Sequence, residues 1–455
     1  MNPQQIEENY LTLQDHCNVR EQLNPNDLAE WIKTKEEIIT FNDTQESFYY
    51  NKNTGLYENA EMLIDQIVQF VAKWKTKTHL INEVKASIAR QTYVKRELIE
   101  GNLNLIPLEN MVYNIDNNEL IDYSPKHYFF TKHPIDLKQE DLQQEEVVIN
   151  PISKWITNIV ETQENEVMLK EMIGYCFYRE VPFQNFFLLV GSGANGKSVL
   201  LNIIHKMLGH KNVSGVSLQQ LADSNNRFSV GNLYLKNANV FGDLPSKALE
   251  DVGLLKQLTG NDILTCDRKF KESFSFRNYA KIIASCNAIP ETNEYSDAFF
   301  RRPIIVKFPY NFEGEGEDRQ LFEKLSTPEN LKGFFLECIQ AFKYALNENQ
   351  FIKKETTETK KKNYLQYSNS AKSFCEDYLE YDPESELQSH VIFDNYSKYC
   401  KNHKLILKDE RQFFINLYKA FGNRVYKKRK RDGSMRYYVV VGIDWKGDSL
   451  PALTL

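Results

Sequence analysis

Apolar and polar positions follow helical spacing in some stretches of this chain and strand spacing in others, and the stretches fall into three regions. Helical spacing over 28–39 and 60–74 encloses a strand pair in 48–57, which a Gly-containing turn joins into a predicted hairpin. A helical stretch over 151–179 then leads into short apolar strands that alternate with helices up to about residue 342. The last region has two or three helical patterns followed by two strands.

These patterns predict an α/β fold with a parallel sheet at its centre. Residues 1–145 are expected to form a mixed α+β accessory domain, and 146–348 the core, with a helical lead-in over 151–184. Residues 349–362 are charge-dense and lack apolar periodicity, so they indicate a linker or a solvated helix. Residues 363–455, with helices before a hairpin, predict a winged-helix domain that binds DNA.

Composition excludes some classes of protein and points to one local asymmetry. The 455 residues are 42% apolar, which is typical of a globular chain. We expect no membrane partner and no export signal, because no apolar run of about 18 residues occurs and the amino terminus is polar. Seven scattered cysteines fit a cytoplasmic setting. Net charge is −6, yet residues 411–455 carry ten Lys and Arg against three Asp.

The most informative motif is the sequence Gly-Ser-Gly-Ala-Asn-Gly-Lys-Ser at 191–198, which matches G-x-x-x-x-G-K-S/T. An apolar run at 186–190 predicts a buried strand before it, and 197–208 predicts an amphipathic helix after it. Such a loop holds the phosphates of a nucleoside triphosphate with its backbone N–H groups and its lysine, while the serine hydroxyl binds Mg²⁺. The candidate nucleotide-binding residues are Gly191, Ser192, Gly193, Ala194, Asn195, Gly196, Lys197 and Ser198.

Polar side chains stand next to three later strands, after two of them and before the third. Asp243 follows the apolar stretch 238–241 and is the predicted Mg²⁺ partner of Ser198, although Asp is also common in ordinary turns. Asn287 follows the strand 281–286 and is predicted to orient the attacking water; a simple turn-forming role is nearly as plausible. Arg301 and Arg302 precede the strand 303–307, where one of them is predicted to stabilise the transferring phosphoryl group, Arg302 being the first choice.

Two hairpins carry basic side chains. The stretch 263–276 predicts a hairpin with a charged turn, and a surface hairpin with charges for solubility explains it equally well. A second hairpin over 426–441 carries consecutive basic residues and an aromatic return strand, which favours binding to double-stranded DNA, alongside a helix at 410–421 that is suited to the major groove. Its candidate DNA-binding residues are Lys427, Lys428, Arg429, Lys430, Arg431 and Arg436.

The order of these features resembles the superfamily three (AAA+) helicases of viruses, phages and plasmids. It is closest to the helicase half of phage and plasmid primase-helicases and to initiator helicases of staphylococcal pathogenicity islands. The residues that carry the resemblance are 191–198, Asp243, 255–262, Asn287 with Pro290, and 297–302. Residues 102–137 resemble the domain that precedes these helicases, and the carboxyl-terminal region resembles their winged-helix tail; the resemblance is strongest over about 100–310 and weakest in the first hundred residues. One departure is that Gly242 stands where many members have a second acidic residue, which leaves the general base open between Glu250, Asp251 and neither.

The resemblance implies a cytoplasmic protein of a bacterial host with ATP and Mg²⁺ as cofactors and a hexameric ring of identical subunits that travels 3′ to 5′. In such a ring the hairpin at 263–276 grips single-stranded DNA in the central channel, which makes Lys269, Phe270 and Lys271 candidate contacts. We therefore predict a DNA helicase that initiates replication of a phage, plasmid or genomic island, with double-stranded origin DNA at the carboxyl-terminal domain and a separate primase as partner. The alternatives are an ATP-switched origin binder without unwinding activity, a primase-helicase, and a protein-remodelling ATPase.

Overall fold

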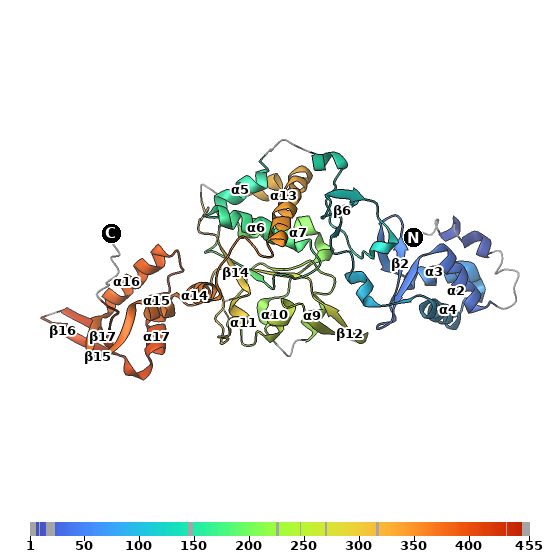
Figure 1. Cartoon of the computed structure of the whole chain (residues 1–455). Coiled ribbons are helices and arrows are strands. Elements are labelled where there is room, and N and C mark those ends of the chain that lie inside the picture. The colour runs from blue at the N-terminus through green and yellow to red at the C-terminus, as the bar shows by residue number, and fades with distance from the viewer. Residues whose placement is uncertain are drawn as a thin grey trace.

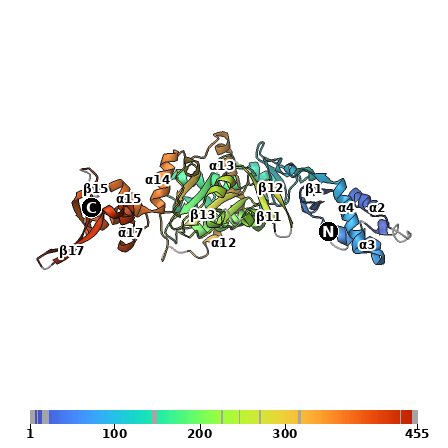
Figure 2. The same ribbon diagram turned by 90° about the horizontal axis from the view of Figure 1, so that it is seen from below.

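Three bodies follow one another along an elongated molecule in the computed structural model, with the two chain ends at opposite ends in both views (Figure 1, Figure 2). The structure describes residues 6–8, 10–14, 23–143, 149–223, 227–245, 247–268, 271–314, 318–433 and 435–447. The amino-terminal body and the carboxyl-terminal body each contact the central one, which contains the phosphate loop.

The amino-terminal body packs three longer helices, together with the helical residues 6–8 and 10–14, against a four-stranded sheet of order β3-β2-β1-β4. Its longer helices are α2 (Pro25–Lys35), α3 (Glu61–Ala72) and α4 (Thr78–Gln91), and its strands are β1 (Ile38–Phe41), β2 (Ser47–Asn51), β3 (Leu56–Asn59) and β4 (Tyr93–Val94). The predicted hairpin at 48–57 is confirmed as β2 and β3. The predicted helix over 28–39 is too long, because the β-branched run Ile38, Ile39 and Thr40 forms β1 instead.

A second small sheet connects this body to the centre. Strands β5 (Leu105–Pro107), β6 (Val112–Asn114) and β7 (Glu119–Ile121) form an antiparallel meander, and Tyr113 belongs to the same apolar core as the central helices. The buried ring of His133 packs edge-on against Phe177, and its Nδ1 lies 2.9 Å from the Leu208 carbonyl oxygen. Residues 105–137 are therefore joined to the centre by buried contacts.

The central body is built on a five-stranded parallel sheet of order β14-β8-β13-β10-β9. Its strands are β8 (Phe186–Val190), β9 (Val213–Ser214), β10 (Ala238–Phe241), β13 (Lys281–Cys286) and β14 (Pro303–Lys307). All five side chains of β8 are buried, as expected for a strand that is covered on both faces. Successive residues of β8 point to opposite faces, so Phe187 and Leu189 join one apolar core while Phe186 and Leu188 join another.

Helices cover both faces of this sheet (Figure 1). The first core contains side chains of α5 (Pro151–Ile159), α6 (Gln163–Cys176), α7 (Lys197–Leu208) and α13 (Pro328–Asn347). The second contains side chains of α8 (Leu218–Leu221), α10 (Gly253–Leu258), α11 (Asp297–Phe300) and the hairpin of β11 (Ile263–Arg268) and β12 (Lys271–Arg277). The smaller helices α9 (Arg227–Gly231) and α12 (Leu321–Leu325) complete this body. The predicted α/β core with a parallel sheet is confirmed.

The carboxyl-terminal body contains three helices and a three-stranded antiparallel sheet of order β15-β17-β16. The elements are α15 (Ser370–Tyr378), β15 (Leu379–Gln388), α16 (Ser389–Asn402), α17 (Glu410–Phe421), β16 (Tyr426–Asp432) and β17 (Met435–Trp445). Helix α14 (Thr357–Ser368) joins it to the centre and runs across the predicted boundary at 362/363. Tyr364 of α14 is buried between Phe299 and Phe300, and its hydroxyl donates to the Pro290 carbonyl.

Candidate nucleotide and nucleic-acid sites

The phosphate loop joins β8 to α7, with the strand and helix bounds that the sequence predicts. Gly193 has a φ of 104° and Gly196 a φ of 90°, conformations that L-residues with side chains rarely adopt. Gly196 is the N-cap of α7, so the free N–H groups of the first helical turn face the loop. The loop backbone is held from the β14 side, because Phe312 N–H donates to the Ala194 carbonyl at 2.8 Å.

Lys197 is folded back into this loop. Its Nζ donates to the Gly191 carbonyl at 2.6 Å and to Asn195 Oδ1 at 3.0 Å, and the side chain is buried. Burial lowers the pKa of Lys197, while Cys286 and Asp243 act in the opposite direction. An anion in the loop would offer this buried cation a stronger partner than two neutral oxygens.

Asp243 and Asn287 lie across the same cleft from the loop. Because β13 lies between β8 and β10 in the sheet, Asn287 enters between the phosphate loop and Asp243. The cleft has a volume of about 1200 Å³ and is lined by residues 192–199 of the loop and first helical turn, together with Gly242, Asp243 and Asn287. Ser198, Asp243 and Asn287 all have exposed side chains, and the first two supply the oxygen ligands that Mg²⁺ prefers.

Sequence reasoning missed one wall of this cleft. Trp155, Asn158 and Ile159 of α5 face the loop, and Asn311, Phe312 and Glu313 close the far side. Glu250 and Asp251, the candidates for a general base, are exposed but do not line the cleft, and Asp251 Oδ1 accepts from the Gly253 N–H at 2.7 Å. The sequence signal for this wall is the apolar face of the 151–159 helix, and the same pattern is typical of a helix that only packs against the core.

The two neighbouring arginines have different environments. Arg302 is 6% exposed, and its guanidinium donates to Thr259 Oγ1 at 3.0 Å and to the carbonyls of Lys256 and Ala298 in its own chain. Arg301 is exposed and donates to Gln184 Oε1 at 3.0 Å. Neither lines the nucleotide cleft of its own chain. Arg302, the first choice from sequence, is thus held inside its own subunit.

The candidate DNA contacts of the first hairpin can be placed only in part. Strands β11 and β12 form the predicted antiparallel hairpin, with Leu264 opposite Phe276. Lys269 and Phe270 lie outside the described residues, and Lys271 is described only as the first backbone position of β12. The inner face of the hairpin is apolar, since Phe274 and Phe276 pack against Tyr234.

The second basic hairpin is present as predicted. Strands β16 and β17 pair from Tyr426 opposite Val441 to Asp432 opposite Met435. Lys427, Lys428, Arg429, Arg431 and Arg436 have exposed side chains, whereas Lys430 is half-buried and ion-paired with Glu386 of β15. Lys427 Nζ lies 4.0 Å from the centre of the Tyr438 ring. The hairpin therefore presents a dense positive charge at the end of the molecule opposite the amino terminus (Figure 1).

The fold and this cleft place the chain in the class of α/β proteins that carry a phosphate loop on a parallel sheet. Comparisons with known proteins show which members of this class it is similar to. Residues 189–302 match a family model described as a family of unknown function, DUF5906. A protein of Acanthamoeba polyphaga mimivirus named "Putative helicase L207/L206" is 23% identical over 277 residues, which make up 60% of this chain and 28% of that protein. The chain thus spans little more than a quarter of the length of this relative.

Solved structures agree on the fold. The apo structure of the NrS-1 C-terminal region superposes with a TM-score of 0.50 and 13% identity, covering 93% of this chain and all of that one. A second form of the same region gives a TM-score of 0.49 at 11% identity, again over 93% of this chain. This likeness covers the overall arrangement of the chain and not the chemistry of the cleft. Among the described residues, none of the helices is both long and apolar enough to cross a bilayer.

Proposed function

We propose that this chain is an ATP-dependent DNA helicase of the superfamily three type, acting in replication initiation of a phage, plasmid or genomic island. The observation that carries the proposal is the single cleft that brings together the phosphate loop, Asp243 and Asn287. The similarity to a viral protein with a helicase name and the fold shared with the NrS-1 C-terminal region support it.

In this proposal the loop amides and Lys197 hold the β and γ phosphates of ATP. Ser198 and Asp243 would hold Mg²⁺, which neutralises charge on those phosphates. Asn287 positions the attacking water, since it is a neutral, exposed amide at the carboxyl edge of the sheet. Trp155 and Ile159 offer an apolar surface beside the loop for the base.

We assign the arginine that completes a neighbouring subunit's site to Arg301. It is exposed and bound only through one side-chain amide, whereas moving Arg302 would break buried hydrogen bonds. Hydrolysis would then depend on assembly into a homo-oligomeric ring, for which the resemblance implies six subunits. Single-stranded DNA would pass through the channel along the hairpin of β11 and β12.

The carboxyl-terminal body would recruit the ring to double-stranded origin DNA. Three helices before a basic hairpin fit a winged helix, with α17 in the major groove and β16 on the backbone phosphates. The protein would thus bind DNA at two places, double-stranded DNA at the origin and single-stranded DNA in the channel. A separate primase would synthesise the primers.

The deciding experiment measures ATP hydrolysis with and without single-stranded DNA for the wild type and for Lys197→Ala. The variant should lose hydrolysis by at least about a hundredfold and keep its melting temperature, because the lysine bonds only to the loop itself. The matched control is Lys211→Ala, an exposed lysine close to the end of α7. Wild-type turnover in Lys197→Ala, or turnover by the wild type that DNA does not affect, would refute the proposal.

A second candidate is an initiator that uses ATP only as an assembly switch. The observation that favours it is the separate basic body joined to the core through α14. Strand displacement on a forked duplex separates the two, because a switch binds origin DNA without releasing a strand.

A further inference from the structure

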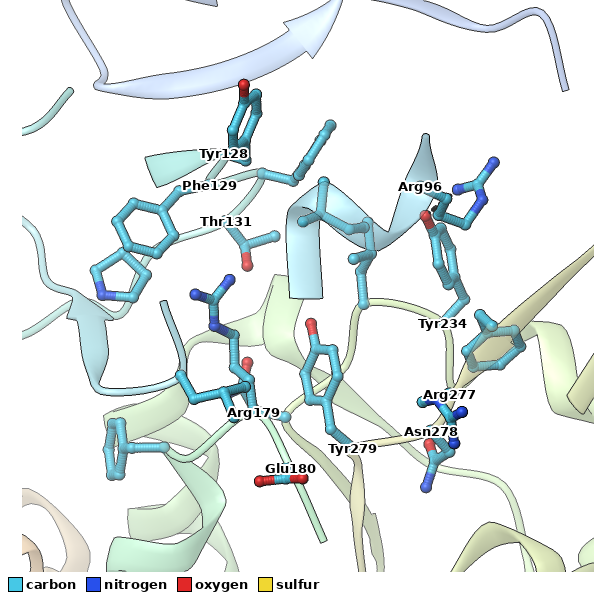
Figure 3. Close-up of a pocket in the computed structure, with 18 of the residues that line it drawn as sticks. Arg96, Tyr128, Phe129, Thr131, Arg179, Glu180, Tyr234, Arg277, Asn278 and Tyr279 are labelled. Carbon is cyan, nitrogen blue, oxygen red and sulfur yellow. Dashed lines mark hydrogen bonds between the residues drawn. The ribbon is translucent and has the colours of Figure 1, made fainter. Parts of the chain in front are cut away.

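A second, partly open cavity lies at the opposite edge of the central sheet from the cleft at the phosphate loop. It has a volume of about 260 Å³ and is lined by residues just before β8, β10 and β13 and by residues 96–133 of the amino-terminal half. The volume is slightly below the ~300–1,000 Å³ of typical small-molecule sites, so one small ligand would fill it. Figure 3 shows that its walls come from both sides of this junction.

Aromatic rings form much of the wall. Phe129 and Tyr128 come from the amino-terminal half, and Tyr234, Phe276 and Tyr279 come from the central body. Figure 3 shows that the hydroxyl of Tyr279 and the guanidinium of Arg179 point toward Thr131. The carboxylate of Glu180 lies on the opposite side of Arg179 and Tyr279 from Thr131. Within the described residues the hydroxyls of Tyr279 and Thr131 have no hydrogen-bond partner, and burial raises the pKa of Tyr279 to about 12.

Arg179 is one of three arginines on this cavity, and it has no carboxylate partner among the residues that the structure describes. Its Nη2 donates to the carbonyls of Asn102 at 3.0 Å and Gly101 at 3.3 Å, and its guanidinium lies 4.9 Å from the Phe129 ring. Its Nε is buried with no hydrogen-bond partner in the described part of the chain. Burial also lowers the pKa of Arg179, which marks the energetic cost of leaving the charge unpaired.

Arg96 on the same wall shows what a fully satisfied arginine looks like in this protein. Asp43 accepts from its Nε at 2.7 Å and its Nη2 at 2.8 Å, and the guanidinium stacks on Phe41 and Phe274 at 4.3 and 4.4 Å. Buried arginines are normally paired in this way. Arg179 is half-buried rather than fully buried, and its free Nε could take an anion that enters the cavity.

We propose that this cavity binds a single nucleotide, with the base among the aromatic rings and the phosphate on Arg179. Aromatic faces stack on any base, and the free hydroxyls of Tyr279 and Thr131 give hydrogen bonds to its edge. Arg277 stands at the exposed side of the cavity, where a second phosphate or the sugar backbone would run. The nucleotide is either free or the end of a DNA strand held by the hairpin, whose strand β12 ends at Arg277.

The test measures binding of deoxynucleoside monophosphates by calorimetry to the full chain carrying Lys197→Ala. Monophosphates lack the β and γ phosphates that the loop holds, and the substitution weakens the loop further, so this measurement does not depend on hydrolysis. Arg179→Gln should weaken binding at least about tenfold, as expected for the loss of a charge-assisted hydrogen bond. Arg90→Gln, an exposed arginine on α4, is the matched control and should have no effect.

Tyr279→Phe keeps the ring but removes the hydroxyl, so it tests the same cavity if Arg179→Gln does not fold. It should weaken binding about threefold or more. Hydrogen exchange should show ligand protection at 128–133 and 277–280. Three results would overturn the proposal. They are undetectable binding to the Lys197→Ala parent, Arg179→Gln and Tyr279→Phe variants that both bind as tightly as this parent, and protection from exchange at 191–198 in place of 128–133 and 277–280.

Two sources of the nucleotide are separated by adding a short single-stranded oligonucleotide. If the ligand is a strand end, Arg179→Gln also weakens oligonucleotide binding and the monophosphate competes with it. If the ligand is a free nucleotide, the two bind together. Failure of the helicase proposal would appear as absent ATP hydrolysis and would leave this binding measurement intact.

Discussion

Arg301 and Arg302 are adjacent in the chain, yet one faces solvent and the other is buried. Arg302 connects the end of α10 to α11 through Thr259 and the carbonyls of Lys256 and Ala298. Such a group stabilises its own subunit, because each of its donors would be left unpaired if the contacts opened. Arg301 has only the Gln184 amide to lose.

We therefore expect Arg302→Ala to lower the stability of the fold and Arg301→Ala to lower the rate of ATP hydrolysis. Arg302→Ala should lower the free energy of unfolding by about 2–4 kcal/mol, since it removes a buried hydrogen-bonded cation. Arg301→Ala should leave stability within about 0.5 kcal/mol but reduce hydrolysis by about a thousandfold, as expected for a trans arginine. Denaturant unfolding and steady-state ATPase assays measure the two effects. A folded Arg302→Ala with no activity, beside a fully active Arg301→Ala, would reverse the assignment.

His133 makes the junction between residues 105–137 and the centre sensitive to acid. Its burial, with the positive charge of Arg179 nearby, lowers the pKa to about 4 although the Leu208 carbonyl raises it. The unfolded chain takes up this proton near pH 6.5 and the folded chain only near pH 4. The stabilising contribution is therefore complete above pH 6.5 and is lost as the pH falls toward 4, by roughly 3 kcal/mol at most.

This contribution can be isolated from the titration of the carboxylates by comparing the wild type with His133→Asn. Chemical unfolding at pH 7 and at pH 4.5 should show a larger loss of stability for the wild type than for the variant. Parallel losses in the two proteins would show that His133 is already protonated in the folded state at pH 4.5.

Helix α14 packs on the central body, although its polar sequence predicts a linker or a solvated helix. It is polar over 357–363, but Tyr364 inserts between Phe299 and Phe300 of the core, and Asn369 after its end contacts Glu291 at 2.9 Å. The helix therefore belongs to the central body as much as to the carboxyl-terminal one. A cut at residue 362 would expose two core phenylalanines.

Two truncations test this division. The fragment 1–368 should keep the thermal stability and basal hydrolysis of the full chain and lose most affinity for double-stranded DNA at low salt. The fragment 1–362 should melt at a clearly lower temperature, because Phe299 and Phe300 lose their cover. Calorimetric melting and fluorescence anisotropy measure these outcomes. Duplex affinity unchanged in 1–368 would remove the carboxyl-terminal body from the DNA-binding model.

The helices and strands of the central body could be predicted from the sequence, because each is specified by the apolar and polar pattern of its own residues. The apolar runs of β8, β10, β13 and β14 are each short and end in a loop, and the helix at α17 begins and ends at the residues expected from its pattern. They placed Asp243 and Asn287 at one edge because parallel strands share a carboxyl edge. The burial of Arg302, the α5 wall of the cleft and the Arg179 cavity depend on contacts between distant segments, which periodicity does not encode.

The phosphate loop and the cleft beside it belong to the central body, and the basic hairpin lies at one end of the molecule (Figure 1, Figure 2). Arg301 lies outside the cleft of its own chain, and under the proposed function it would complete the cleft of a neighbouring subunit. Activity should therefore depend on neighbours in the assembled form.

Mixing two inactive variants tests this requirement. Lys197→Ala keeps Arg301, and Arg301→Ala keeps Lys197, so a mixed ring contains some sites with both residues. Hydrolysis should reappear on mixing, reaching about a quarter of the wild-type rate when random assembly brings equal amounts together. A mixture as inactive as its components would mean that Arg301 acts within its own subunit or in another role.

Strand β13 begins two residues after Tyr279, which lines the Arg179 cavity, and ends directly before Asn287. Its residues 281–284 pair with β10 on one side and its residues 283–286 with β8 on the other, and all six of its side chains are buried. A strand gripped in this way resists bending and sideways shift, so the easiest displacement is a slide along its own axis. An occupant that pushes on residues 277–280 would thus pass that push along the strand to Asn287 at its other end.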